Sequence, residues 1–198
     1  MRVSDVDEEA VLGELIRRRR EAGLAAPTAA EQVQALARAK ALDVMASTDP
    51  QEAEVVVGCD SMLEISGQVV GKPTDAADAR ERWRLMSGGT GTLHTGHFLV
   101  RTADGAIAEG VSSATIRFGS PSQAEIEAYV ASGEPLWCAG AFTIDGLGGA
   151  FIEGIDGDPH GVVGISLPLL RRLLADLDVV WTELWAPPPV TRPADDAH

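Results

Sequence analysis

The sequence predicts an α/β protein in which a mixed, twisted β-sheet is flanked by helices. Segments with helical periodicity alternate with segments rich in β-branched residues, and short clusters of glycine, proline and serine separate them. The 198 residues, 45% of them apolar, suffice for one hydrophobic core. We therefore expect one domain over residues 1–185 and a disordered, proline-rich tail over residues 186–198.

Two helices are expected first. Residues 8–22 place apolar side chains at helical spacing and precede a glycine. Thr28 and Glu31 have the spacing of a capping box, which opens a second helix that continues to about residue 46 and carries Lys40.

The apolar run at residues 55–57 predicts a buried strand. Gly58 allows another backbone to approach closely, and we expect Asp60 to emerge at the C-terminal end of this strand, where helix-covered sheets bind ligands. Residues 62–70 predict a strand, a Ser-Gly turn and a return strand. This hairpin brings Lys72 back toward Asp60.

The remaining elements follow from similar signals. In order, we expect a helix from Thr74 to the glycines at 88–89, a hairpin of strands 93–101 and 106–118, a helix with Ser120 as N-cap and Pro121 in its first position, a strand, turn and strand over 139–152, a helix over 167–177 and a strand over 179–184.

The charge balance argues against nucleic-acid binding. The chain has 16 Lys and Arg against 30 Asp and Glu, a net charge of -14. The arginine run at residues 17–20 lies between glutamates on the first helix, which favours a solvated helical face. A small anionic substrate therefore needs a local positive site, and Lys40 and Lys72 are the two lysines of the chain.

The sequence predicts no membrane partner. Residues 1–8 lack the apolar core of a signal peptide, and no window approaches the ~18 apolar residues of a membrane span. A cytoplasmic location is expected. Cys59 and Cys138 are too few for a disulfide framework or a zinc site, so we expect two buried, reduced thiols.

An aspartate and a lysine brought together suit a phosphate site. Asp60 can hold a divalent metal or take a proton from water, while Lys72 neutralises charge on phosphate oxygens. The alternative is a surface aspartate that ends a strand and a lysine in a proline turn, and spacing alone does not decide between them. The four histidines offer no rival site, and no dinucleotide, P-loop or nucleophile-elbow motif occurs.

Four motifs are informative in their order. Ser-Asp-Val-Asp-Glu occupies residues 4–8, Leu-Ala-Arg-Ala-Lys-Ala occupies 36–41, Gly-Cys-Asp-Ser occupies 58–61 and Gly-Lys-Pro occupies 71–73. Together they resemble the Maf family of nucleoside triphosphate pyrophosphatases. The likeness extends to residue 185 and continues through residues 87–88, 94–96, 134–135, 139–142, 157–158, 162–164 and 167–169.

The resemblance implies a Maf/ITPase-like sheet and hydrolysis of a nucleoside triphosphate to the monophosphate and pyrophosphate, with Mg²⁺ or Mn²⁺ as cofactor. It implies that Asp60 is the general base, or a metal-bound carboxylate beside the attacking water. Glu8 would help to hold the metal, and Lys40 and Lys72 would bind the triphosphate. Asp158 is either a further ligand or a turn residue. A homodimer is also implied.

By the same resemblance, Ser61 and Asp145 are substrate-binding residues that influence the choice of base. A carboxylate at 145 can accept hydrogen bonds from the N1-H and N2-H₂ edge of guanine, which favours GTP or 7-methyl-GTP. Trp137 and Cys138 stand where the branch that acts on dTTP and UTP has an Asp-Lys pair, which points the same way.

One departure from the family pattern is large. The chain begins at the acidic segment and lacks the family's first strand and its Ser-x-Ser-Pro-Arg-Arg type phosphate loop. We expect the natural protein to extend further at its N-terminus. The alternative is a truncated, catalytically inactive family member that acts as a nucleotide-binding or regulatory protein, and a more distant one is an interaction domain unrelated to nucleotides.

Overall fold

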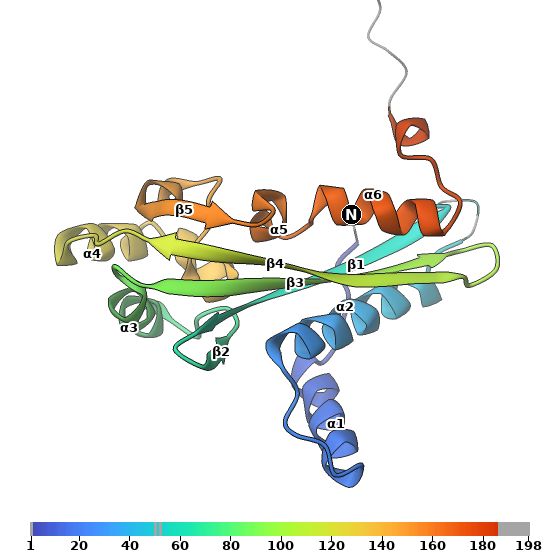
Figure 1. Ribbon diagram of the computed structural model, residues 1–198, viewed down its shortest axis with the longest axis horizontal. Coiled ribbons are helices and arrows are strands. Elements are labelled where there is room, and N and C mark those ends of the chain that lie inside the picture. Colours follow the sequence, from blue (N-terminus) through green and yellow to red (C-terminus); the bar gives the residue numbers. More distant parts are fainter. Residues whose placement is uncertain (1, 50, 52, 186–198) are drawn as a thin grey trace, which may run out of the picture.

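A five-stranded sheet forms the centre of the fold in a computed structural model that describes residues 2–49, 51 and 53–185 (Figure 1). The strand order is β2-β1-β3-β4-β5, and the four pairings described are all antiparallel. The predicted α/β class is confirmed, and the predicted tail, residues 186–198, lies outside the described residues. The strands are β1 (Val55–Ile65), β2 (Gln68–Val70), β3 (Thr90–Arg101), β4 (Ile107–Phe118) and β5 (Ile152–Asp156).

Helices flank both faces of the sheet, with α2 on one side and α5 and α6 on the other (Figure 1). Within the described part of the chain, none of them combines the length and apolar character needed to cross a bilayer. The α-helices are α1 (Glu8–Glu21), α2 (Ala29–Ala46), α3 (Ala76–Met86), α4 (Gln123–Ala131), α5 (Pro159–Val163) and α6 (Leu167–Asp176), and the 3-10 helices are η1 (Glu134–Trp137), η2 (Ala139–Ala141), η3 (Leu147–Phe151) and η4 (Trp181–Leu184).

The alternation of side chains along β3 divides the core between the two faces. Phe98 is fully buried in a cluster with Ala37 and Ala41 of α2. Leu99, the next residue, is buried in a separate cluster with Leu173 of α6. Since neighbouring strand residues point to opposite faces, two small cores stabilise one sheet from both sides.

Two glycines let α2 approach the sheet closely. The helix opens with the predicted capping box of Thr28 and Glu31. A Cβ at Gly58 of β1 would lie 2.8 Å from the Cβ of Ala41, and a Cβ at Gly96 would lie 2.8 Å from the Gln34 nitrogen. Backbone thus fills the space that side chains would need, and this close contact brings α2 against the middle of β1.

Helix α1 projects from the body of the molecule and has no buried residue (Figure 1). Arg17, in its predicted solvated face, pairs with Glu14 and Glu21 at 2.6 Å each. Ion pairs from Glu8 and Arg19 to α2 connect the two helices. Val11 and Leu12 of α1 also pack, partly buried, against the cluster that contains Val33 and Leu36 of α2. Both polar and apolar contacts therefore set the position of Glu8.

The predictions of a last strand and of two strands within 139–152 are wrong. Val179 is buried against α6, and the chain then makes a 3-10 turn in which the Glu183 nitrogen donates to the Val180 carbonyl at 3.0 Å. In residues 139–151, Gly140 has a φ of 71° and 3-10 turns replace extended backbone, so that only β5 forms, beginning at Ile152.

Two helix starts also differ from prediction. Helix α4 begins after Ser122, not Ser120, because Ser122 and Glu125 form the capping box. Helix α3 begins at Ala76 rather than at Thr74, because the Asp75 carboxylate accepts hydrogen bonds from the first-turn nitrogens.

An aromatic cluster at one end of the sheet holds the segment that follows α4. Trp83 is fully buried and makes edge-to-face contacts with Phe118, Tyr129 and Phe151. Its indole Nε1 donates to the Ala141 carbonyl at 2.8 Å. This bond fixes the backbone of η2, which borders the pocket described next.

Candidate active site

A pocket of about 290 Å³ opens at the edge of β1. Since β2 pairs only with residues 63–65, the preceding part of β1 has β3 as its one described strand partner and its other edge faces the pocket. Its walls come from both faces of the sheet and from the segments after α4 and β5. The lining residues are Lys40, Cys59, Asp60, Ser61, Lys72, Trp137, Cys138, Ala139, Phe142, Thr143, Val162, Val163 and Gly164.

Asp60 lies in the middle of β1, so the prediction that it ends the strand is wrong. It pairs in register with Gly96, and the strand continues because β3 offers partners as far as Glu64. The expected proximity of acid and lysine is nevertheless present, because Asp60 and Lys72 both line the pocket.

A chain of two carboxylates and one ammonium forms the charged wall of the pocket. Lys40 Nζ lies 2.5 Å from Asp60 Oδ1 and 2.7 Å from Glu8 Oε1. The Asp60 side chain is 11% exposed, whereas that of Glu8 is 52% exposed. The one ammonium therefore links a buried acid to an acid that faces solvent.

Burial and pairing act in opposite directions on these groups. Burial raises the pKa of Asp60 above its ordinary value, and the hydrogen bond from Lys40 offsets only part of this rise. Burial lowers the pKa of Lys40, but the hydrogen bonds to Asp60 and Glu8 outweigh it, so that this pKa is raised. Lys40 is charged at neutral pH, and Asp60 is a more basic carboxylate than a solvated aspartate.

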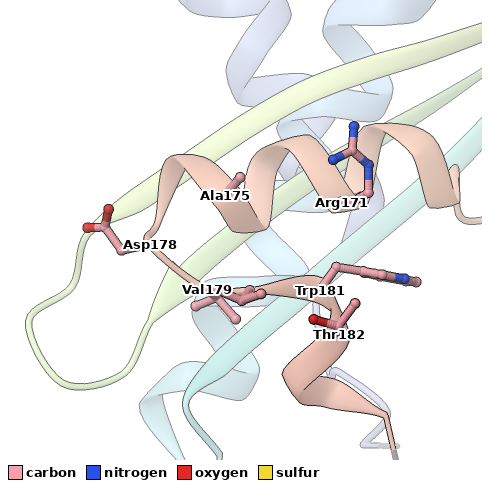
Figure 2. Close-up of a pocket in the computed structure, with 7 residues that line it drawn as sticks. Arg171, Ala175, Asp178, Val179, Trp181 and Thr182 are labelled. Atoms are coloured by element: carbon pink, nitrogen blue, oxygen red, sulfur yellow. The ribbon is translucent and has the colours of Figure 1, made fainter.

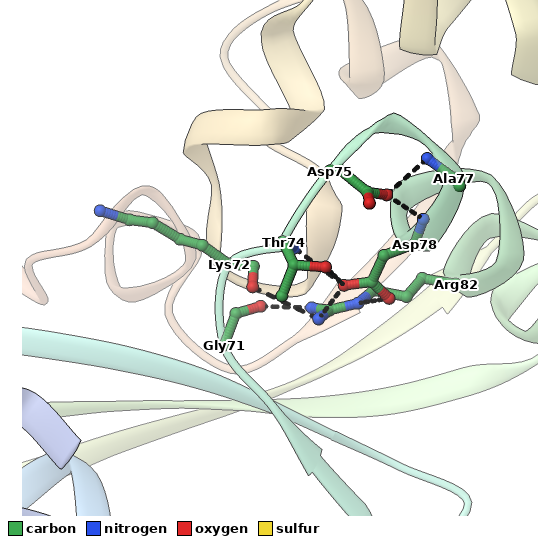
Figure 3. A network of polar contacts seen from close by, with 7 residues as sticks. All are labelled: Gly71, Lys72, Thr74, Asp75, Ala77, Asp78 and Arg82. Atoms are coloured by element: carbon green, nitrogen blue, oxygen red, sulfur yellow. Dashed lines mark hydrogen bonds and ion pairs between the residues drawn. The ribbon is translucent and has the colours of Figure 1, made fainter.

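Lys72 contributes the second positive charge. Its side chain is exposed and extends away from the loop that carries it (Figure 3). The positive charge of Lys72 acts to lower the pKa of Asp60, which places the two groups within electrostatic reach. The pocket thus presents two ammonium groups around one buried carboxylate.

The Ser61 hydroxyl belongs to a directed chain of hydrogen bonds. Ser61 Oγ lies 2.8 Å from Thr95 Oγ1, and Thr95 Oγ1 donates to the Gly161 carbonyl at 2.7 Å. Because the Thr95 hydroxyl has one proton and donates it to the Gly161 carbonyl, Ser61 must be the donor in its bond with Thr95. Ser61 therefore presents lone pairs, and not a proton, to the pocket.

Asp145 does not line the pocket. Its carboxylate accepts a hydrogen bond from the hydroxyl of Thr143, and Thr143 is the residue that lines the wall. Asp158, considered as a ligand or a turn residue, is the N-cap of α5 and lies 2.9 Å from His160 Nδ1. Among the residues predicted for the site, Lys40, Asp60, Ser61 and Lys72 line the pocket, and Glu8 joins them through Lys40.

Several lining residues were not predicted for the site, among them Trp137, Thr143 and Val162. Trp137 is 79% exposed although it is a large aromatic residue, which gives the pocket a flat apolar rim. The sequence signal available at this position is the tryptophan next to a cysteine, noted above only through the family resemblance.

Both cysteines also line the pocket. Both are free cysteines, as predicted, but they are only partly buried, so the prediction that they are buried is wrong. Burial raises the pKa of Cys59 to about 12, and burial followed by the charge of Glu134 raises the pKa of Cys138. Protonated thiols are poor nucleophiles and poor metal ligands, so neither carries the chemistry of the pocket.

The oxygen donors of the pocket fit a hard divalent cation only in part. Glu8 and Asp60 supply two carboxylates, and no group of three or more metal-ligating side chains occurs among the described residues. Mg²⁺ usually takes one or two carboxylates and completes its shell with water and phosphate oxygens. The donor set therefore fits a metal that arrives with a phosphate ligand.

A larger hollow, of about 490 Å³, lies between α6 and η4 and is lined mainly by apolar groups (Figure 2). Its charged side chains, Arg171 and Asp178, lie at opposite ends (Figure 2). Because it brings no acid and base together, the β1 edge pocket is the better candidate for an active site.

Two lysines and a buried carboxylate in one edge pocket of an α/β fold form the charge pattern that is typical of phosphate-handling proteins. The chain belongs to the Maf-like protein family, whose profile matches residues 1–177.

Three relatives illustrate the similarity, and each is named nucleoside triphosphate pyrophosphatase. The Streptomyces coelicolor protein is 53% identical over 185 residues, which cover 93% of this chain and 83% of the relative. The Salinispora tropica protein is 54% identical over 160 residues, 80% of this chain and 71% of the relative. The Mycobacterium sp. (strain JLS) protein is 49% identical over 188 residues, 92% and 86% of the two chains.

Proposed function

We propose that this protein is a nucleoside triphosphate pyrophosphatase whose active site is the β1 edge pocket. The observation that carries the proposal is the chain from Glu8 through Lys40 to the buried Asp60, with Lys72 beside it. The names of relatives about half identical to the chain support the same activity. Water attacks the α-phosphorus, the bond to the bridging oxygen breaks, and the monophosphate, pyrophosphate and a proton are released.

Asp60 acts as general base in this proposal. Its raised pKa makes the carboxylate a better proton acceptor than a solvated aspartate, and its burial keeps bulk water away from the reacting atoms. Lys40 holds the carboxylate in place through the bond to Oδ1. Lys72 compensates charge on the phosphate oxygens, a role that suits an exposed ammonium on a flexible stem.

Glu8 and Asp60 would hold a divalent cation, Mg²⁺ or Mn²⁺, together with phosphate oxygens of the substrate. Such a cation supplies charge compensation for the triphosphate. Glu8 is suited to the role because it faces solvent, so it can exchange its ion pair with Lys40 at small cost.

The opposite wall is proposed to select the base. Trp137 offers a flat surface for stacking, and Ser61 offers a hydrogen-bond acceptor for a base or sugar N-H or O-H group. The acceptor that Ser61 offers is consistent with a guanine-type base, since the Watson–Crick edge of guanine carries N1-H and N2-H₂ donors. Asp145 does not line the pocket, so its contribution would be indirect, through the Thr143 hydroxyl that it orients.

The test is pyrophosphate release from GTP, 7-methyl-GTP, dTTP, UTP, CTP and ATP, with Mg²⁺, with Mn²⁺ and with chelator. We expect release that requires the cation, and a drop of at least about 100-fold for Asp60→Asn, the range of general-base loss. Asp104→Asn is the matched control, because that exposed aspartate lies in a surface ion pair with Arg101.

Absence of release from every nucleotide by the wild-type chain would contradict the proposal. Nucleotide-dependent stabilisation against heat without turnover would then support the alternative of a catalytically inactive binding protein. Full activity of Asp60→Asn would exclude Asp60 as the base while leaving the pyrophosphatase activity intact.

A further inference from the structure

The loop that carries Lys72 is held by a polar network centred on Arg82 (Figure 3). Strand β2 ends at Val70, so the Gly-Lys-Pro segment at residues 71–73 lies outside the sheet. Arg82, on α3, directs its guanidinium at the backbone of this segment, and its side chain is 15% exposed. The ammonium of Lys72 extends in the direction away from Arg82 (Figure 3).

Arg82 contacts two consecutive carbonyls of the loop. Nη1 donates to the Gly71 carbonyl at 2.6 Å, and Nη2 donates to the Lys72 carbonyl at 3.3 Å. The Gly71 carbonyl also accepts from the Gly140 nitrogen at 2.9 Å. One carbonyl thus connects Arg82, the lysine loop and the opposite wall of the pocket.

Asp78 holds the guanidinium in this orientation. Arg82 Nε lies 2.9 Å from Asp78 Oδ1 and Nη2 lies 2.7 Å from Oδ2, a bidentate pair. The same Oδ2 accepts from the Thr74 nitrogen at 2.9 Å, beyond the proline. The loop is therefore tied to α3 on both sides of Lys72.

We infer that Arg82 is a positioning residue for the proposed reaction, which sets the place of the Lys72 ammonium relative to Asp60. The inference rests on the proposed function of Lys72 as a phosphate-binding group. A lysine stem is flexible, so the position of its ammonium in the pocket depends on where its backbone is fixed. Arg82 fixes that backbone through carbonyls, and it does not itself line the pocket.

The experiment is a double-mutant cycle of Arg82→Met and Lys72→Ala, with kcat and KM measured on the triphosphate that the wild-type chain cleaves fastest. We expect Arg82→Met to raise KM about tenfold, the loss of one charge-assisted contact, with kcat changed less than about twofold. In the Lys72→Ala background, Arg82→Met should have no further effect on KM.

Arg84→Met is the matched control. Arg84 lies on the same helix and pairs with Glu81 at 3.2 Å on the exposed side, so this change should leave KM unchanged. Asp78→Asn is the milder second variant if Arg82→Met does not fold. It keeps the guanidinium but loses the ionic part of its anchor, and should raise KM by less than Arg82→Met.

Two outcomes would overturn the inference: a lower melting temperature for Arg82→Met with an unchanged KM, or KM effects that multiply in the double variant. If the wild-type chain releases no pyrophosphate, the proposed function fails, and calorimetric binding of inorganic tripolyphosphate is used for the same cycle. A tripolyphosphate affinity that Arg82→Met weakens only when Lys72 is present still supports the positioning role.

Discussion

At the scale of single residues, the direction of each hydrogen bond in the Ser61–Thr95–Gly161 chain has measurable consequences. Thr95 is fully buried and satisfies the Gly161 carbonyl. Ser61 only donates into the chain, and its oxygen faces the pocket. The two hydroxyls are therefore unequal, although they differ by a single methyl group.

We expect Thr95→Val to destabilise the protein by about 1–3 kcal/mol, since it removes both the bond from Ser61 and the bond to the Gly161 carbonyl, which keeps only its bond from the Gly164 nitrogen. Ser61→Ala should cost less, about 0.5–1.5 kcal/mol, because the bond from Thr95 to Gly161 remains. Urea unfolding of both variants measures the difference. Equal losses of stability in the two variants would show that the hydrogen bonds do not run from Ser61 to Thr95 and from Thr95 to Gly161.

The proximity of Asp60 and Lys72 was predictable from sequence, because a short hairpin between them leaves the chain little choice of direction. The contact between Glu8 and Lys40 had no such local cause, and only the family resemblance assigned both residues to the site. Trp137 ends the 3-10 helix η1, and Thr143 follows η2, within the range 139–152 for which two strands were predicted. Contacts that depend on irregular backbone leave no periodic pattern in the sequence.

At the scale of elements, the close packing of α2 on β1 decides whether Lys40 can reach Asp60. Gly58 is the point of closest approach, since an added Cβ would collide with the Ala37 carbonyl oxygen and would lie 2.8 Å from both the nitrogen and the Cβ of Ala41. The helix has no room to absorb this methyl group without moving away from the strand.

Gly58→Ala is therefore expected to lower the free energy of unfolding by about 1–3 kcal/mol and to weaken pyrophosphate release, because it moves Lys40 relative to Asp60. Gly13→Ala is the control: its added Cβ meets nothing within 4 Å in α1, and alanine should raise stability by up to about 1 kcal/mol. Thermal unfolding should show a lower stability for Gly58→Ala and a higher stability for Gly13→Ala. Pyrophosphate release should weaken in Gly58→Ala. A neutral Gly58→Ala would show that α2 shifts freely.

Local signals determined the elements that the sequence predicted well. The capping box of Thr28 and Glu31 opens α2 as expected, because both bonds form within one turn. The predicted strand after α6 failed for a nonlocal reason: Val179 is apolar because it packs on α6, and no described strand offers its backbone a partner there. A short apolar run therefore does not show whether the segment is a strand or is buried for another reason.

At the scale of the whole molecule, His97 joins the sheet to the start of α6. It is fully buried, Nδ1 donates to the Thr95 carbonyl at 3.0 Å, and Nε2 accepts from the Ser166 nitrogen at 2.8 Å. Because Nε2 accepts, the ring is neutral. Burial lowers the pKa of His97 below its ordinary value, although the bond to Thr95 and the charge of Asp158 act against it.

Global stability should consequently fall as the pH drops below about 6.5, the unfolded pKa of histidine. Below that value the unfolded chain binds a proton that the folded chain refuses, until the lower folded pKa is reached. Urea unfolding from pH 7.5 to pH 5 measures this loss, with His97→Gln as the variant that should lack it and His160→Gln, partly exposed, as the control that retains it. If His97→Gln lost stability with falling pH as the wild-type protein does, His97 would not be the cause of the loss.

The position of the pocket at an open strand edge lets one strand serve two tasks. Asp60 turns toward α2, and Ser61, its neighbour, turns toward α5, yet both border the same cavity. Asp60 is therefore supported by Lys40 of α2 and Ser61 by the hydrogen bonds that lead to α5, whereas the Lys72 loop is tied to the opposite wall through the Gly71 carbonyl. A substitution at Ser61 can thus change the hydrogen bonding offered to the base and leave the Lys40–Asp60 pair in place, whereas a substitution that moves Gly140 would disturb both walls.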